Sequence, residues 1–406
     1  MPRPAISTRR PGRNLTALAA SLALGGLAVA GCGAADDVGQ APASSSASPT
    51  PCPAIPPDAA LPAGQVTFGV NPDWGSETLE QFTDATQLVP GAAVSFVGMP
   101  LTATDAQNVT AAAEQVGATG GVLMLTLEPH DGLAAVTDGS IADLTELLAE
   151  INATGVPVLV RFAHEMNGSW YAWGQQPEAY VATFRRVAAA VHDGAPASQM
   201  LWAPNYGGGY PFAGGRHAAE VGTADGDRLD VDGDGELTQA DDPYAPYYPG
   251  DDAVDWVGMS LYHWGSTYPW GEDEVPEEGK FAAQLTGTYD GLGGDDRNLP
   301  DFYATYTDEH GKPLAIPETA AFVTADADPD LALEIKRTWW RQVFSDDVHV
   351  RFPDLRLVNW FDWDKHEVEV DAQVRWSLSG DPAVAEAFRA DLPSWVRTGP
   401  GAGDCS

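Results

Sequence analysis

Eight short apolar runs, separated by segments with helical spacing, constrain the fold of this chain more than any other feature. Such runs are typical of strands buried on both faces of a parallel sheet. In the segment between the fourth and fifth runs, Tyr180, Phe184 and Val187 recur on one helical face, with Pro177 near its start. This alternation predicts a single-domain α/β fold, the (β/α)8 TIM barrel. The runs lie at residues 66–70, 93–98, 122–127, 158–162, 200–203, 256–261, 313–316 and 355–360.

Acidic, imidazole and aromatic side chains follow nearly every predicted strand. In a TIM barrel the chemistry lies at the C-terminal ends of the strands, where the connecting loops meet. A rim with a purely structural role would not concentrate these residue types so consistently, so we expect a functional site there. The side chains in question include Asp73, Trp74, Glu128, His130, His164, Glu165, Asn205, Tyr206, Tyr262, His263, Glu318, Asp362 and Trp363.

Two of these side chains fit the hydrolysis of a glycosidic bond. Glu165 ends the fourth strand and Glu318 ends the seventh. Glycoside hydrolysis needs two carboxyl groups that flank one bond, together with aromatic surfaces for sugar rings. A lone glutamate at a strand end is more often a satisfied core residue, but the histidine, asparagine and tryptophans around Glu165 favour a functional role. The predicted aromatic surfaces are Trp170, Trp173, Trp360 and Trp363.

The fourth strand end also carries a family resemblance. Residues 161–174, with the sequence RFAHEMNGSWYAWG, resemble the acid/base segment of glycoside hydrolase family 26, most members of which are endo-acting β-mannanases. Residues 312–319 resemble the nucleophile strand of that family, and residues 255–262 resemble its sixth strand. The resemblance extends over the whole predicted barrel from Gln65 onward.

The resemblance implies a retaining hydrolase that needs no cofactor for catalysis. Glu165 would be the acid/base and Glu318 the nucleophile of a double displacement. His164 would contact the sugar at the cleavage site, and Tyr262 would orient Glu318. Arg161, which lies within the fourth strand, is predicted to pair with a carboxylate rather than to bind substrate.

The implied substrate is β-1,4-mannan or galactomannan, cut at internal bonds. Pro317, Ala320 and the segment that begins at Ser260 depart from the family pattern. Mixed-linkage β-glucan and β-1,3-xylan therefore stay open as substrates. From other classes, a non-catalytic carbohydrate-binding lipoprotein is the main alternative, against which the presence of both glutamates weighs. A metalloenzyme is a third possibility, although no pair of histidines has ligand spacing.

The first 31 residues are predicted to be a signal peptide. Four arginines precede an apolar stretch that ends in small residues. Residues 29–32, Val-Ala-Gly-Cys, resemble a bacterial lipobox, which would leave Cys32 as a lipidated N-terminus. Residues 28–30 offer ordinary secretion as the alternative. We therefore expect an exported protein, which is either held at the membrane only by lipid at Cys32 or freely secreted. We also expect a monomer.

The remaining sequence divides into a linker and the barrel. Residues 33–64 are rich in Pro, Ser and Ala and predict a flexible linker, with residues 65–406 forming the hydrolase domain. The two further cysteines, Cys52 and Cys405, would form a disulfide between the ends of the mature domain, with two unpaired thiols as the alternative. The net charge of −37 excludes nucleic acid and anionic membranes as natural partners and suits a neutral polysaccharide.

An acidic insertion near residues 225–245 predicts a calcium loop. Its sequence, DVDGDGELTQAD over residues 230–241, places oxygen ligands at loop positions 1, 3 and 5 and glycine at position 6. A solvated acidic turn is the alternative. A bound Ca²⁺ would stiffen this loop rather than take part in catalysis. The predicted ligands are Asp230, Asp232, Asp234, Glu236 and Asp241.

Overall fold

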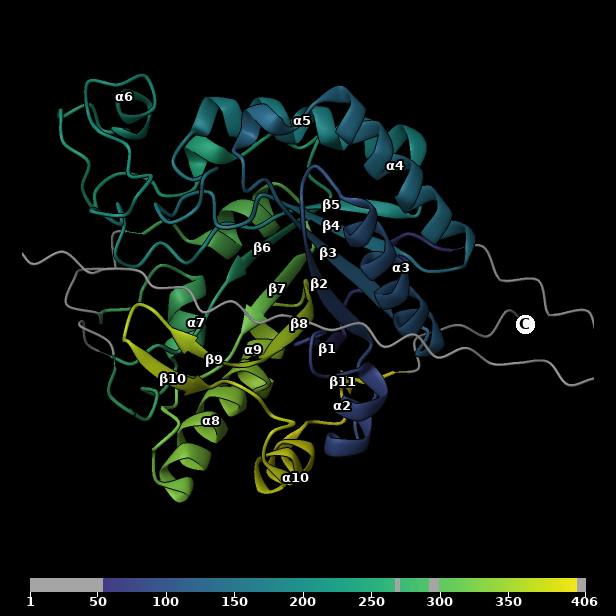
Figure 1. Cartoon of the computed structure of the whole chain (residues 1–406). Coiled ribbons are helices and arrows are strands. Elements are labelled where there is room, and N and C mark those ends of the chain that lie inside the picture. The colour runs from purple at the N-terminus through teal and green to yellow at the C-terminus, as the bar shows by residue number, and fades with distance from the viewer. Residues whose placement is uncertain (1–53, 267–270, 292–298, 400–406) are drawn as a thin grey trace, which may run out of the picture. The chain divides into compact units, whose positions relative to one another are not determined.

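The computed structural model describes residues 54–266, 271–291 and 299–399. Its eight parallel strands follow the chain in order, and β1 pairs with β8 to close a barrel (Figure 1). Every predicted strand is present, and the (β/α)8 barrel is confirmed. The strands are β1 (Val66–Pro72), β2 (Ala92–Gly98), β3 (Val122–Glu128), β4 (Val158–Phe162), β5 (Ser198–Trp202), β6 (Trp256–Ser260), β7 (Leu314–Thr319) and β8 (Leu355–Asp362).

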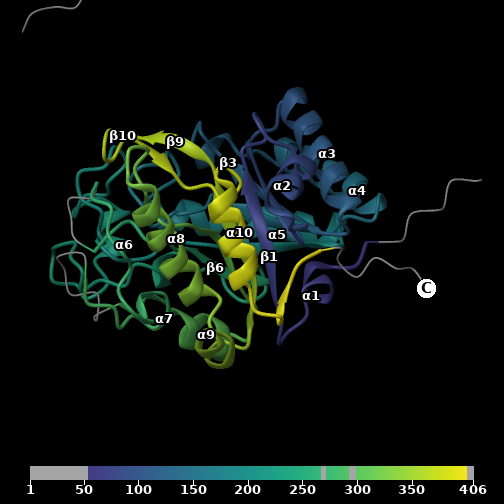
Figure 2. The same ribbon diagram turned by 90° about the horizontal axis from the view of Figure 1, so that it is seen from below.

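Helices cover the outside of the barrel, and their first residues explain where they begin. Thr78, Thr102 and Thr137 each cap a helix and form a capping box with the residue three positions later. The larger helices are α2 (Leu79–Thr86), α3 (Ala103–Ala118), α4 (Asp138–Ala153), α5 (Pro177–Gly194), α8 (Pro329–Val343) and α10 (Pro382–Asp391). The short ones are α1 (Pro57–Ala60), α6 (Gly226–Leu229), α7 (Lys280–Leu285) and α9 (Asp346–Arg351). In Figure 2, α10 runs beside β1, and it packs against both α8 and α2.

The end of the predicted linker belongs to the barrel instead. Helix α1 precedes Leu61, which is 2% exposed and packs with Ala92, Val94 and Val122 in the barrel interior. Asp58 also forms two hydrogen bonds of 2.9 Å with the side chain of Gln199. The prediction of a flexible segment up to residue 64 is therefore wrong at its end, because an apolar side chain there fills a space inside the barrel.

The sequence did not indicate a small hairpin that follows β8. Strands β9 (Asp364–Glu367) and β10 (Ala372–Arg375) pair antiparallel and lie beside β8 (Figure 1). A final strand, β11 (Val396–Arg397), pairs in parallel with the start of β1. The hairpin matters for function, because it adds a wall to one side of the C-terminal rim.

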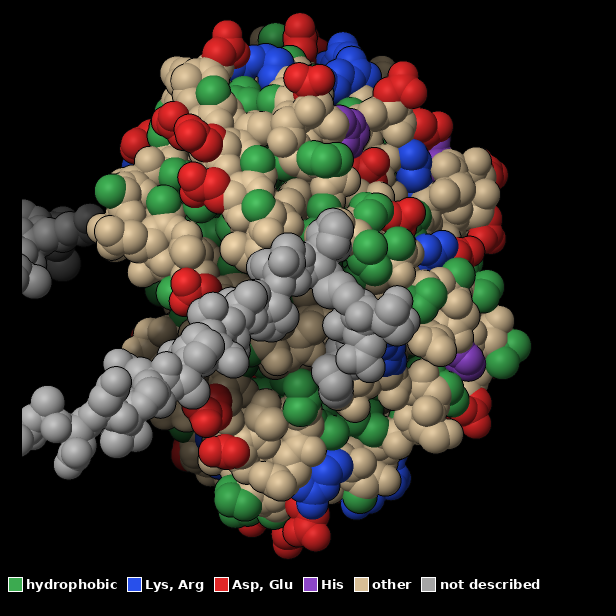
Figure 3. Space-filling model, turned by 90° about the vertical axis from the view of Figure 1, so that its right-hand side faces the viewer, with side chains coloured by type: hydrophobic (Ala, Val, Ile, Leu, Met, Phe, Trp, Pro, Cys, Tyr) green, Lys and Arg blue, Asp and Glu red, His purple; other side chains and the backbone are tan. Residues whose placement is uncertain are grey.

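Several predictions fall on residues outside the described ranges. These are the signal peptide, the lipid site at Cys32 and the pairing of Cys52 with Cys405. Among the described residues, no helix is both long and apolar enough to cross a membrane. Figure 3 shows acidic side chains spread over the visible face, with no single patch of one charge.

Candidate active site

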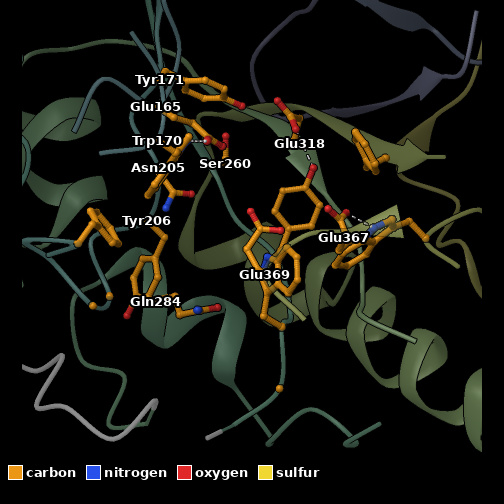
Figure 4. A pocket seen from close by; sticks show the side chains of 18 of the residues that line it. Glu165, Trp170, Tyr171, Asn205, Tyr206, Ser260, Gln284, Glu318, Glu367 and Glu369 are labelled. Carbon is orange, nitrogen blue, oxygen red and sulfur yellow. Dashed lines mark hydrogen bonds between the residues drawn. The ribbon is translucent and has the colours of Figure 1, made fainter. Parts of the chain in front are cut away.

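A cleft of about 680 Å³ opens at the C-terminal ends of the strands. Glu165 and Glu318 both line it, as Figure 4 shows. Because these two glutamates come from opposite parts of the sequence, only barrel closure brings them together. Other lining residues include Trp170, Tyr171, Asn205, Tyr206, Phe212, Ser260, Tyr262, Trp264, Lys280, Gln284, Phe361, Lys365, Glu367, Glu369 and Trp376.

The backbone after β4 turns sharply to present Glu165. Ala163 and Glu165 have φ angles of 46° and 53°, in the left-handed region that non-glycine residues rarely adopt. The turn is held by a 3.0 Å hydrogen bond from the Glu165 amide to the Ala203 carbonyl. The side chain of Asn167 bonds both the amide and the carbonyl of Asn205 on the loop after β5. Asn167 thus connects the loop after β4 to the loop after β5.

The environment of Glu165 favours a protonated carboxyl group. Burial and the neighbouring charge of Glu318 raise its pKa to about 7, against a smaller opposing effect of Arg161. The indole nitrogen of Trp170 donates to Glu165 Oε2 at 3.1 Å and fixes its direction. A carboxyl group that still carries its proton near neutral pH can act as a general acid.

Glu318 is held differently, by groups that stabilise the carboxylate. Strand β7 loses regular register with β6 and β8 around Pro317, and a proline, which has no N–H to donate, is tolerated at such an irregularity. The guanidinium of Arg161, fully buried, forms an ion pair with Glu318 Oε1. The Tyr262 hydroxyl donates to Glu318 Oε2 at 2.7 Å. Arg161 therefore pairs with a carboxylate, and that carboxylate is Glu318 itself.

The spacing of the two glutamates bears on the stereochemistry of the reaction. A carboxylate oxygen of Glu165 and one of Glu318 lie within 4.8 Å of each other. Retaining glycosidases separate their carboxyl groups by about 5–5.5 Å, whereas inverting ones need about 6.5–9.5 Å to admit water. The geometry favours direct attack by Glu318 on the sugar.

The predicted aromatic surfaces divide between the cleft and the core. Trp170 lines the cleft and is 38% exposed. Trp173 is fully buried beneath Tyr171, which stacks on it with ring centroids 4.3 Å apart, so the prediction that Trp173 contacts substrate is wrong. Its indole nitrogen instead donates to the His164 carbonyl at 2.7 Å and supports the turn that carries Glu165.

Trp360 and Trp363, at the end of β8, do not line the cleft. Trp360 is fully buried, packs against Trp340 and Phe388, and donates to the Trp376 carbonyl at 2.9 Å. It is a core residue, and its predicted contact with substrate is wrong. Trp363 is partly buried against Phe361, outside the lining of the cleft.

His164 lies beside the two glutamates, with a ring nitrogen within 4.8 Å of a carboxylate oxygen of each. It is 2% exposed, and its ring contacts those of Tyr171 and Trp173. Burial, with a smaller effect of the Arg161 charge, holds the pKa of His164 well below its usual range, so the imidazole is neutral. Its contact with the sugar stays a prediction.

Sequence reasoning missed several cleft residues. Ser260 accepts a hydrogen bond of 2.6 Å from Arg161, and Tyr171 lines the cleft beside Trp170. The β9–β10 hairpin contributes Lys365, Glu367 and the nearby Glu369. A short hairpin carries no distinctive sequence signal. Tyr171, in contrast, is adjacent to Trp170 in the motif, and this position is a signal that could have predicted it as a cleft residue.

A second carboxyl pair at the rim predicts pH-dependent stability. Burial and the charge of Asp362 raise the pKa of Glu77 to about 7 from 4.5. The stability that Glu77 contributes is complete below pH 4.5 and is lost as the pH rises through about 7. We expect the urea midpoint of unfolding to fall between pH 5 and pH 8, and to fall less in Glu77→Gln. Glu80→Gln, an exposed change on α2, should behave as the wild type; equal slopes in both variants would contradict the assignment.

The acidic insertion has part of the predicted geometry. Carboxylate oxygens of Asp230, Asp232 and Asp234 lie within 4.8 Å of one another. Gly235 donates to Asp230 Oδ2 at 2.9 Å, while the buried Asp230 Oδ1 has no hydrogen-bond partner among the described residues. Asp241 is directed elsewhere: its oxygens accept the backbone amides of Val231 at 2.6 Å and Thr238 at 2.9 Å. Glu236 is exposed and lies outside the three-carboxylate group.

Residues 115–211 match the family model described as glycosyl hydrolase family 26. A curated relative, Endoglucanase H of Acetivibrio thermocellus, is 27% identical over 177 residues, which cover 41% of this chain and 17% of that protein. The match thus spans less than a fifth of the relative. These findings confirm the resemblance that the β4 motif indicated, and they support a glycoside hydrolase.

Solved structures agree with this fold. An endo-β-1,4-mannanase double mutant of Cellulomonas fimi is 18% identical, with a TM-score of 0.51, and the match covers 83% of this chain and 73% of that one. The GH26C protein of a Muricauda species is 13% identical, also with a TM-score of 0.51, over 84% of this chain and 88% of the other. At such identities the likeness establishes the barrel.

Proposed function

We propose, from the resemblance to glycosyl hydrolase family 26 and the geometry of the cleft, that this chain is a retaining endo-β-glycanase. The observation that carries the proposal is the pair of carboxyl groups within 4.8 Å, one with a pKa raised to about 7 and the other paired with a buried guanidinium. Two neighbouring carboxyl groups with such different environments are what a general acid and a nucleophile require. No cofactor is needed for either role.

In the first step Glu318 attacks the anomeric carbon while Glu165 gives its proton to the leaving oxygen. The bond from the anomeric carbon to that oxygen breaks, and an ester between the sugar and Glu318 forms. Arg161 and Tyr262 hold Glu318 in line, and Trp170 directs Glu165.

In the second step water replaces Glu318. Glu165, now ionised, removes a proton from the water as its oxygen bonds to the anomeric carbon, and the ester breaks. Both inversions occur at the same carbon, so the product keeps the β configuration. Glu165 finishes protonated and ready for another cycle.

The substrate we favour is β-1,4-mannan or galactomannan, with mixed-linkage β-glucan as the second candidate. The mannanase among the similar structures supports the first, and the name of the curated endoglucanase supports the second. The deciding experiment incubates the protein with mannan, galactomannan, lichenan and β-1,3-xylan and measures new reducing ends. If the protein binds one of these polysaccharides but releases no reducing ends from any of them, the result would favour a non-catalytic carbohydrate-binding protein.

We also propose a structural Ca²⁺ on the acidic insertion, held by Asp230, Asp232 and Asp234. Ca²⁺ prefers oxygen ligands, and Asp230 Oδ1, which has no hydrogen-bond partner among the described residues, is available to coordinate it. EDTA should then lower the melting temperature by about 5 °C, and added Ca²⁺ should restore it. The variant Asp232→Ala should lose this response, while Asp252→Ala, an exposed change outside the loop, should keep it. An unchanged melting temperature in EDTA would contradict the calcium site and indicate that the insertion is a solvated acidic turn.

Export and lipid anchoring at Cys32 remain part of the proposal. The lipobox-like residues 29–32 support them. In a bacterial host, labelled palmitate should enter the protein and fail to enter Cys32→Ser.

A further inference from the structure

The side chain of Gln284 is a buried polar group that the proposed chemistry leaves unused. Gln284 is 3% exposed, lines the cleft, and its Oε1 has no hydrogen-bond partner among the described residues. Buried side-chain polar atoms are nearly always hydrogen-bonded, so an unpaired one on the wall of a cleft points to a ligand.

Helix α7 also brings Lys280, one helical turn before Gln284, to the wall of the cleft. Lys280 is 2% exposed, donates to the Gly265 carbonyl at 2.7 Å and lies 3.2 Å from His263 Nδ1. It also lies 3.3 Å from Glu277 Oε2. Because the ammonium is engaged by these neighbours, Gln284 is the side chain on this face of α7 that retains capacity for a ligand.

Two further residues lie around the same end of the cleft. Tyr206, 7% exposed, comes from the loop after β5, and Glu369, exposed, comes from the β9–β10 hairpin. In Figure 4 Tyr206 and Gln284 lie below Glu165 and away from Glu318, and the Glu369 side chain extends toward the middle of the cleft. An aromatic ring, an amide and a carboxylate match the apolar faces and hydroxyl groups of a neutral sugar.

The position of Gln284 relative to Glu165 and Glu318 determines which part of the substrate lies at this end of the cleft. Glu318 bonds to the sugar that stays on the enzyme, and Glu165 protonates the oxygen that leaves. The end of the cleft beyond Glu165 therefore faces the leaving portion of the chain.

We propose that Gln284, with Tyr206 and Glu369, forms a binding site for a sugar unit of the leaving portion of the polysaccharide. This site rests on the proposed hydrolase function and extends it, because it would set the substrate length that the enzyme needs.

The test compares two kinds of substrate in Gln284→Leu. An aryl β-glycoside, whose leaving group is a phenol, places no sugar in this site, whereas mannohexaose or a mixed-linkage glucohexaose does. We expect kcat/KM on the hexaose to fall about tenfold, with the aryl glycoside unchanged within about twofold. Gln107→Leu, the same change at an exposed position on α3, should leave both values unchanged.

Calorimetric titration of both hexaoses separates this site from the hydrolysis itself, with Glu318→Gln present in both proteins so that no hexaose is cut. Glu318→Gln that binds a hexaose about tenfold more tightly than the double variant Glu318→Gln/Gln284→Leu supports the site, even if the proposed hydrolase function fails. Equal affinity of these two proteins for both hexaoses, or equal losses on hexaose and aryl glycoside in Gln284→Leu, would overturn it.

Discussion

Glu318→Gln should lower kcat on the polysaccharide by at least about 10⁴-fold, because an amide cannot form the glycosyl ester. The amide oxygen still accepts from Arg161, and the amide nitrogen can donate to the Tyr262 hydroxyl oxygen in place of the bond that Tyr262 donates in the wild type, so the variant should fold. Initial rates of reducing-end release, with the melting temperature as a check on folding, measure the effect. Glu334→Gln, an exposed change on α8, is the matched control and should retain full activity.

Glu318→Ala gives a stricter test of the role. The smaller side chain leaves room for azide, which should attack the anomeric carbon of an aryl glycoside and give a glycosyl azide of inverted configuration. Removing the carboxylate also leaves Arg161 buried without its ionic partner, which we expect to cost about 3–5 kcal/mol of stability. Full activity of either variant would rule out Glu318 as nucleophile.

Glu165→Gln should lower kcat on the polysaccharide by about 10²–10⁴-fold, the usual size of general acid catalysis. An aryl glycoside with an acidic phenol needs no proton on its leaving oxygen, so its first step should be nearly unaffected. Hydrolysis of the intermediate should then limit turnover, and a burst of phenol should precede the steady state. Equal losses on both substrates, with no burst, would argue against the acid/base role.

The pH profile provides an independent measurement of the same group. Because Glu165 must be protonated in the first step and its pKa is raised to about 7, kcat/KM should fall as the pH rises through about 7. In Glu165→Gln the residual kcat/KM on the polysaccharide should lose this decline between pH 6 and pH 8. Glu128, whose pKa burial also raises to about 7, supplies the control: Glu128→Gln should keep the decline.

The barrel could be predicted because each strand is a local signal. A run such as residues 122–125 is apolar throughout, which is typical of a strand covered on both faces, and eight apolar runs with helices between them leave few alternatives. The position of Glu165 and Glu318 at the ends of such strands followed directly. The prediction for Trp360 was wrong because local sequence does not distinguish a tryptophan that stacks on a sugar from one that packs in the core. In the structure Trp360 is fully buried.

The sequence by itself determined the eight-stranded barrel and the two rim carboxyl groups, because strand periodicity and the residues after each strand are properties of short segments. Only the tertiary structure decided that Arg161 pairs with Glu318, and that the β9–β10 hairpin and Gln284 on α7 complete the cleft. It also decided the raised pKa of Glu165. The physical reason is that burial, charge proximity and a separation of no more than 4.8 Å between carboxylate oxygens arise between residues more than 100 positions apart, and the closed barrel alone sets those distances.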